Sequence, residues 1–148
     1  MKMIEVEKVA RVLGGKKILG RDIRSLLDLE ETVSEGLPTK SLEHCLDAIY
    51  TSAPRKRGIM YMVVPRATWR RRLRKQILKA GESEKTERLA RVIATARQVW
   101  DDDDDAREFL DTPHPELAGK RPIHAAMTEL GARHVEDILW SITYGLPA

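Results

Sequence analysis

The sequence contains very little cysteine and few aromatic residues. Cys45 is its one cysteine, Phe109 is its one phenylalanine, and aromatic residues make up 5% of the 148 positions. A single thiol excludes an intramolecular disulfide and a cysteine-based zinc site, and it is typical of proteins of the reducing cytosol. We predict that Cys45 is a small core residue, and that a hydrophobic core alone stabilises the fold, because a chain of this length buries enough surface.

Long apolar segments are missing as well. The longest uninterrupted one spans residues 59–64, and it is far shorter than the roughly 20 residues that cross a bilayer. Glu5 and Glu7 occupy the stretch in which a signal peptide has its apolar region. We therefore expect a cytoplasmic protein that makes no contact with a membrane.

Signatures of catalysis and of metal binding are also scarce. The sequence has no phosphate-binding glycine loop and no serine in a nucleophile elbow. No paired metal-ligand spacing occurs among its histidines, which are His44, His114, His124 and His134. We predict no catalytic residue, no metal ligand and no cofactor.

The aspartate run at residues 101–105 resembles the start of a calcium loop. Such a loop has glycine at its sixth position and glutamate at its twelfth, where this sequence has Ala106 and Thr112. The run is better explained as a cap for the helix that follows, or as a flexible acidic linker. A helical nucleic-acid hydrolase that uses the run with a metal is the enzymatic alternative, and it would require cleavage that chelation abolishes.

Charge is abundant, and its two signs are separated along the chain. Residues 1–97 hold 22 Lys and Arg against 12 Asp and Glu, a net charge of +10, while residues 98–148 hold 4 against 11, a net charge of −7. Residues 55–79 contain ten basic residues and no acid. This block fits a polyanion such as nucleic acid. The acidic half would be repelled by the same polyanion, so we expect it to bind a different partner.

Apolar residues recur with a helical period through most of the chain, and no segment alternates with a period of two. We therefore predict an all-α fold. Asp28 and Ser83 are predicted to cap helices, and Gly131 is predicted to form a turn between two others. The expected helices cover approximately residues 4–13, 28–35, 42–50, 56–62, 66–79, 83–100, 106–110, 122–130 and 132–144.

Residues 56–79 are predicted to form a helix-turn-helix, because a short helix, a tight turn and a very basic second helix follow one another. The second helix would turn one face inward, and this face carries Trp69, Leu73 and Ile77. Its early outward positions could reach base edges, and they are Arg66, Thr68 and Arg71. Its other basic side chains would neutralise phosphates, and they are Arg70, Arg72, Arg74 and Lys75. The alternative is an ordinary solvated basic helix surface.

The last predicted helix has two faces. A core stripe is expected from Val135, Ile138, Leu139 and Ile142. The opposite face forms a ridge that leads to Gly145 and Ala148, and it consists of Arg133, Asp137, Trp140 and Tyr144. Because Trp, Tyr and Arg are frequent binding hot spots, we predict that this ridge binds a partner. The alternative is that a neighbouring helix covers it.

Several of these segments resemble one family. Residues 13–15, 36–38, 66–72 and 86–91 are similar to the Xre-like antitoxins of bacterial RES-Xre type II toxin-antitoxin systems. The C-terminal resemblance is more specific and is carried by residues 106–110, 113–122, 129–132, 135–139 and 144–145. The similarity covers nearly the whole chain.

The resemblance implies two helical domains. Residues 1–97 would be an Xre-like helix-turn-helix domain for DNA binding and dimerisation, and residues 98–148 a toxin-binding domain. The protein would be an antitoxin that represses its own operon and covers the active site of a RES-domain toxin acting on NAD. By motif, DNA contacts would fall on Arg66, Thr68, Arg71 and Arg72, and toxin contacts near Trp140, Tyr144 and Gly145. A stand-alone helix-turn-helix regulator with a C-terminal oligomerisation domain is the alternative.

Overall fold

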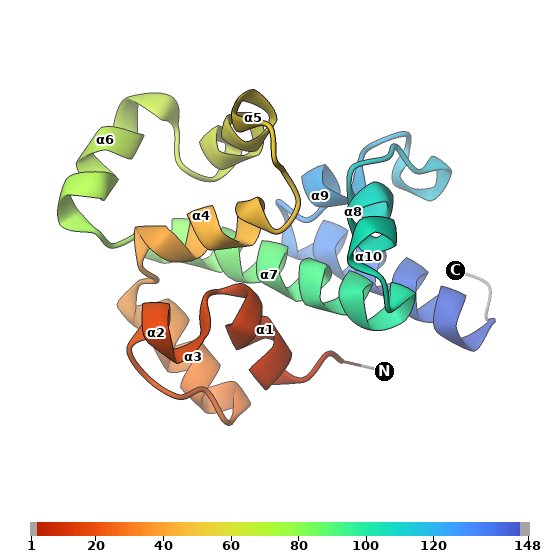
Figure 1. Ribbon diagram of the computed structural model, residues 1–148, viewed down its shortest axis with the longest axis horizontal. Helices are drawn as coiled ribbons and strands as arrows, with labels where there is room; N and C mark the ends of the chain where they lie inside the picture. The colour runs from red at the N-terminus through yellow and green to blue at the C-terminus, as the bar shows by residue number, and fades with distance from the viewer. Residues whose placement is uncertain (1–2, 146–148) are drawn as a thin grey trace.

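The computed structural model describes residues 3–145, and this part of the chain consists of helices and loops (Figure 1). The all-α prediction is confirmed. The helices are α1 (Val6–Val12), α2 (Gly15–Leu19), α3 (Leu26–Glu35), α4 (Thr39–Asp47), α5 (Ala53–Val63), α6 (Arg66–Lys75), α7 (Ala80–Trp100), α8 (Asp103–Leu110), α9 (Pro122–Ala125) and α10 (Glu129–Tyr144), with a short 3-10 helix, η1 (Pro115–Leu117).

Helix α7 is the centre of the molecule. It contacts α1, α3, α4 and α5 of the N-terminal part as well as α8 and α10 of the C-terminal part (Figure 1). Its apolar stripe is fully buried at Leu89, Val92 and Ala96, and Cys45 of α4 is buried in the same core. Both halves of the chain therefore share one helix, and the predicted domain border after residue 97 lies close to its C-terminal end.

The beginning of α3 differs from the prediction. Ser25 caps this helix, because its hydroxyl accepts a hydrogen bond from the Asp28 backbone N–H at 3.0 Å. Asp28 lies in the first turn, and its carboxylate accepts from the Arg24 backbone N–H at 2.9 Å. The predicted cap at Asp28 is therefore wrong by three residues, since both side chains are good caps and sequence alone did not choose between them.

Helix α7 also begins earlier than predicted, at Ala80, and Ser83 does not cap it. Glu82 accepts a hydrogen bond from the Lys79 backbone N–H at 2.9 Å and so satisfies the start of the helix. Ser83 is fully buried, and its hydroxyl accepts from the Leu37 backbone N–H at 2.9 Å. This side chain therefore joins the loop between α3 and α4 to α7.

Gly131 lies inside α10 and does not form the predicted turn. Thr128 caps α10 by accepting from the Gly131 backbone N–H at 3.0 Å, whereas α9 already ends at Ala125. A Cβ atom on Gly131 would lie 1.9 Å from the carbonyl oxygen of Ala125. Glycine is needed here because the end of α9 approaches the first turn of α10 so closely.

Candidate DNA-binding and partner-binding surfaces

The α5–α6 pair has the geometry of a helix-turn-helix. Helix α5 buries Ile59, Met60 and Val63 against the core, and a two-residue turn of Val64 and Pro65 leads into α6. The Pro65 carbonyl accepts from the Thr68 backbone N–H at 2.8 Å, which closes the first turn of α6. Helix α6 lies at the edge of the molecule and projects from it (Figure 1).

The C-terminal end of α6 is fixed by a backbone contact with the α3–α4 loop. Gln76 takes a left-handed conformation with φ 61° directly after the helix. The last residue of α6 is therefore Lys75, four residues before the predicted end at residue 79. The Leu78 N–H then donates to the Leu37 carbonyl at 2.8 Å, and the Thr39 N–H donates to the Gln76 carbonyl at 3.3 Å. Gly36 permits this approach, because a Cβ there would lie 2.7 Å from the Leu78 oxygen.

Arg72 faces the body of the protein. The sequence predicted that this side chain contacts phosphate, but its burial argues against that contact. It is 4% exposed, and its Nε and Nη2 donate to the two carboxylate oxygens of Glu82 at 2.6 and 3.0 Å. The bond to Glu82 raises the pKa of Arg72. Burial opposes ionisation of Glu82, but its bonds to Arg72 and to the Lys79 N–H hold its pKa below the ordinary value. Arg72 is therefore a positioning residue that joins α6 to α7.

The predicted inward face of α6 is also partly wrong. Trp69 is half-buried against the core, but Leu73 is 43% exposed and Ile77 is 42% exposed. The side of α6 that faces the body passes through Trp69 and Arg72, because the Arg72–Glu82 bond fixes the rotation of the helix. Leu73 consequently lies at the edge of the contact.

The outer side of α6 carries a dense positive charge. Within the described residues 3–145, five exposed basic side chains of this helix have no ion-pair partner, and they are Arg66, Arg70, Arg71, Arg74 and Lys75. Thr68 is half-buried at the beginning of the helix. Apart from Arg72, the residues of α6 that were predicted to contact DNA therefore have exposed or half-buried side chains.

Two further residues of the basic block are already paired within the protein. Lys56 contacts Asp47 at 2.6 Å, and Arg55 forms an ion pair with Asp111. Asp111 also accepts from the Tyr50 hydroxyl and from Arg121 Nη1, each at 2.8 Å. The sequence did not reveal this cluster, which ties the start of α5 to the C-terminal half.

Helix α10 partly follows its predicted pattern. Val135, Ile138 and Leu139 are buried as expected, but Ile142 is 44% exposed. Trp140 is only 8% exposed, so its predicted place on an open ridge is wrong. Trp140 and the N-terminal segment near Ile4 line a common cavity, and the Trp140 ring stacks with Tyr144 at a centroid distance of 6.3 Å.

The other predicted partner contacts that the structure describes are accessible. Arg133 and Asp137 are exposed, and Tyr144 is 51% exposed near the C-terminal end of α10. Gly145 ends the helix in a left-handed conformation, with φ 64°. Ala148 lies outside the described residues. The accessible part of the ridge therefore consists of two charged side chains and one tyrosine.

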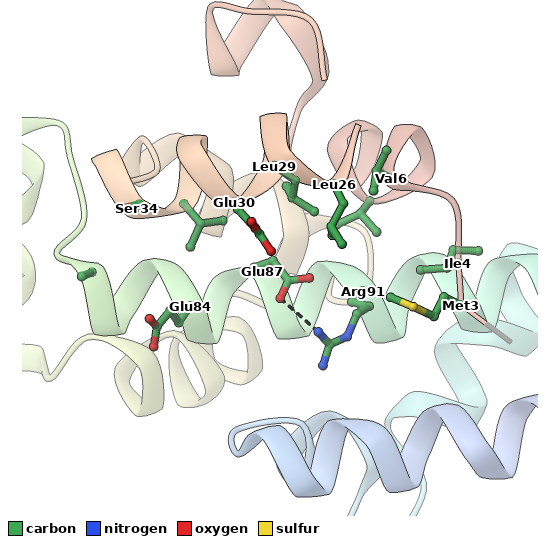
Figure 2. Close-up of a pocket in the computed structure, with 13 residues that line it drawn as sticks. Met3, Ile4, Val6, Leu26, Leu29, Glu30, Ser34, Glu84, Glu87 and Arg91 are labelled. Carbon is green, nitrogen blue, oxygen red and sulfur yellow. Dashed lines mark hydrogen bonds and ion pairs between the residues drawn. The ribbon is translucent and has the colours of Figure 1, made fainter. Parts of the chain in front are cut away.

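A partly buried ion cluster joins α7 to α10. Arg91 donates from Nε to Glu136 at 2.7 Å and from Nη2 to Glu129 at 2.8 Å, and it contacts Glu87 at 3.3 Å. Figure 2 shows the Glu87 and Arg91 side chains pointing toward each other. Burial raises the pKa of Glu87 to about 7, and it also raises the pKa of Glu136.

Glu87 also lines a cavity of about 350 Å³ between α3 and α7 (Figure 2). Its apolar lining includes Leu29 together with Met3 and Leu26, which are 59% and 51% exposed. Glu30 and Glu84 add negative charge. Sequence reasoning missed this cavity, because its residues come from helices that are distant in the chain.

Comparison with known proteins agrees with this arrangement. Residues 28–91 match the family model described as the antitoxin Xre-like helix-turn-helix domain, and residues 95–145 match the antitoxin Xre/MbcA/ParS C-terminal toxin-binding domain. The chain belongs to the Xre-like antitoxins. It is also 26% identical over 129 residues to a protein of Pseudomonas putida named Antitoxin Xre, an alignment that covers 83% of this chain and 81% of that protein.

This antitoxin thus has a helix-turn-helix domain followed by a toxin-binding domain, and the two family matches meet within α7. Among residues 3–145, no helix is long and apolar enough to cross a membrane. In the same part of the chain, no three His, Cys, Asp or Glu side chains are grouped as metal ligands.

Proposed function

We propose that this antitoxin represses its own operon by placing α6 in the major groove of operator DNA. The observation that carries the proposal is the set of five exposed basic side chains of α6 that lack an ion-pair partner among the described residues. Arg66, Thr68 and Arg71 lie early enough on the helix to reach base edges. Arg70 and Lys75 then neutralise phosphates.

The antitoxin acts as a homodimer. One short helix offers few base contacts, and operators read by helix-turn-helix proteins are usually two-fold, with half-sites about one helical turn apart. Light scattering at micromolar concentration, with and without operator DNA, tests this. A monomer in both conditions contradicts the dimer.

The C-terminal half, residues 98–148, inhibits a RES-domain toxin that acts on NAD. The antitoxin has no catalytic part in this; it covers the entrance of the toxin's active site. The support is the exposed end of α10, where Tyr144 and Gly145 are accessible, and the negative charge of this half, which separates its partner from DNA. Residues 1–97 then serve DNA binding and dimerisation, with the border near the end of α7.

Two binding measurements test the proposal. Fluorescence anisotropy with the antitoxin's own promoter fragment should show affinity that falls steeply with salt, by roughly 0.9 in log–log slope for each phosphate neutralised. A pull-down with the product of the adjacent gene should recover a stable complex that no longer consumes NAD. Failure to bind the promoter, alone or with that protein, removes the repressor function. Recovery of no complex removes the inhibitor function.

A further inference from the structure

A second cavity lies at the junction of α7 and α8, in the toxin-binding domain. It is open and has a volume of about 370 Å³. Its lining combines aromatic rings with carboxylates, and the residues that matter are Trp100, Asp105, Glu108, Phe109 and His114. The DNA and toxin contacts proposed above include none of these side chains.

The rings form a continuous wall. The Trp100 and Phe109 centroids lie 6.2 Å apart with the planes inclined by 44°, and the Phe109 and His114 centroids lie 6.0 Å apart at 62°. Trp100 is 36% exposed. The negative face of an aromatic ring attracts a cation within about 6 Å, and tryptophan does so best.

The two carboxylates at this cavity differ from the three that precede them in the chain, because those three already have partners within the protein. Asp102 caps α8 by accepting from the Asp105 backbone N–H at 2.9 Å, Asp103 contacts Arg97 at 3.7 Å, and Asp104 pairs with Arg107. Within residues 3–145, the carboxylates of Asp105 and Glu108 have no ion-pair partner. They are three residues apart on α8 and therefore share one side of the helix.

We propose that this cavity receives an arginine side chain of the toxin, an inference that rests on the toxin binding proposed above. A guanidinium is planar and always charged, stacks on aromatic rings, and presents several donors to carboxylates at once. A lysine ammonium is a compact and strongly hydrated charge that stacks less well. A nucleic acid does not fit, because Asp105 and Glu108 repel its phosphates.

The charge of the cavity is tested in the full chain with the product of the adjacent gene. Asp105→Asn combined with Glu108→Gln removes two charges and keeps the side-chain shapes. Asp101→Asn combined with Glu116→Gln is the matched control, because both residues are exposed, neither lines the cavity and the net charge changes equally. We expect at least about tenfold weaker binding for the first pair and less than about twofold for the control. Equal affinity of the two pairs overturns the inference.

The rings are tested by Trp100→Leu, with Trp100→Phe as its conservative partner. Leu removes the π face, whereas Phe keeps it, so toxin affinity should fall for the first and be largely retained by the second. Thermal unfolding of each variant shows that the fold persists. If both variants lose affinity equally, the tryptophan acts through packing and the arginine site is refuted.

A small probe separates the cavity from the proposed function. We expect N-acetyl-arginine-N-methylamide to shift the Trp100 indole N–H resonance, which is assigned by its loss in Trp100→Phe. The neutral isostere N-acetyl-citrulline-N-methylamide should leave it unchanged. An equal response to both probes, or to neither, refutes the site. If the intact chain fails to bind the adjacent gene product, toxin inhibition is refuted, and the two probes still decide whether the cavity binds a guanidinium.

Discussion

The Arg72–Glu82 bond predicts that Arg72 positions α6 through α7 and does not share in the DNA contacts proposed for the exposed residues of this helix. Arg72→Ala leaves the Glu82 carboxylate, whose side chain is 13% exposed, without its guanidinium. Hydrogen bonds to charged groups contribute about 1.5–3 kcal/mol. Because α6 projects and buries little else, we expect a loss of about 2 kcal/mol, which lowers Tm by about 4–8 °C for a chain of this size. Urea unfolding and calorimetry measure both quantities.

The decisive variant is Arg72→Met combined with Glu82→Gln. The glutamine can still accept from the Lys79 N–H, and it is neutral, so no charge remains buried without a partner. Stability and operator affinity should both recover relative to Arg72→Ala, although the guanidinium is absent. Arg71→Ala is the contrast: it should leave Tm unchanged and weaken operator binding by about 1–3 kcal/mol. If operator binding stays lost in the double variant while stability recovers, Arg72 contacts DNA and the reasoning fails.

Two further substitutions test the C-terminal domain. Tyr144→Ala should lower toxin affinity at least about tenfold with unchanged Tm, whereas Trp140→Ala should cost about 3 kcal/mol of stability, because it removes a buried ring. Circular dichroism melts and toxin titration distinguish the two variants. A Trp140→Ala variant with native Tm contradicts the burial of Trp140. Gly131→Ala should destabilise the fold by at least about 1 kcal/mol through its clash with the Ala125 carbonyl, although alanine favours helix elsewhere. Gly81→Ala is the control, because Gly81 lies at an exposed helical position with open space around it, and this variant should not destabilise the fold.

The fold class and the location of the basic helix were predictable because they depend on local patterns. Helical periodicity and a block of ten basic residues without an acid are visible in a short window of sequence. The resemblance to Xre-like antitoxins was likewise carried by short motifs, and the family comparison confirmed it. The helix-turn-helix geometry follows from Val64 and Pro65, which end one helix and start the next.

The errors about Arg72 and Trp140 share one physical cause, since the burial of each side chain depends on parts of the chain that are distant in sequence. A helical wheel gives the relative orientation of side chains, but it does not show which sides acquire neighbours. Arg72 is buried where α7 brings Glu82 to it, and the buried Trp140 lines a cavity together with a segment from the opposite end of the chain. One signal was available: Glu82 is the first acid after the basic block and the natural partner for one of its arginines.

The Glu87 cluster gives the antitoxin a pH-dependent stability whose sign can be worked out. Burial raises the pKa of this carboxyl from 4.5 to about 7. Arg91 and Arg88 lower it, and Glu129 and Glu136 oppose them. Between pH 4.5 and about 7 the folded state keeps the proton that the unfolded state has released, so the free energy of unfolding falls as pH rises through this window and levels off above it. Each pKa unit corresponds to about 1.4 kcal/mol, so the fall amounts to a few kcal/mol at most.

Glu87→Gln should therefore remove the part of this fall that Glu87 contributes, while Glu136, whose pKa burial also raises, keeps its own part. The variant should be more stable than the natural chain at pH 8 and about equally stable at pH 5, because the natural glutamate is already protonated in the folded state at the lower pH. Urea unfolding at pH 5, 6, 7 and 8 measures the difference. Glu84→Gln is the control, since Glu84 lines the same cavity from α7 but is exposed. A stability difference between Glu87→Gln and the natural chain that does not change with pH would show that Glu87 is ionised in the folded state throughout, held so by Arg91.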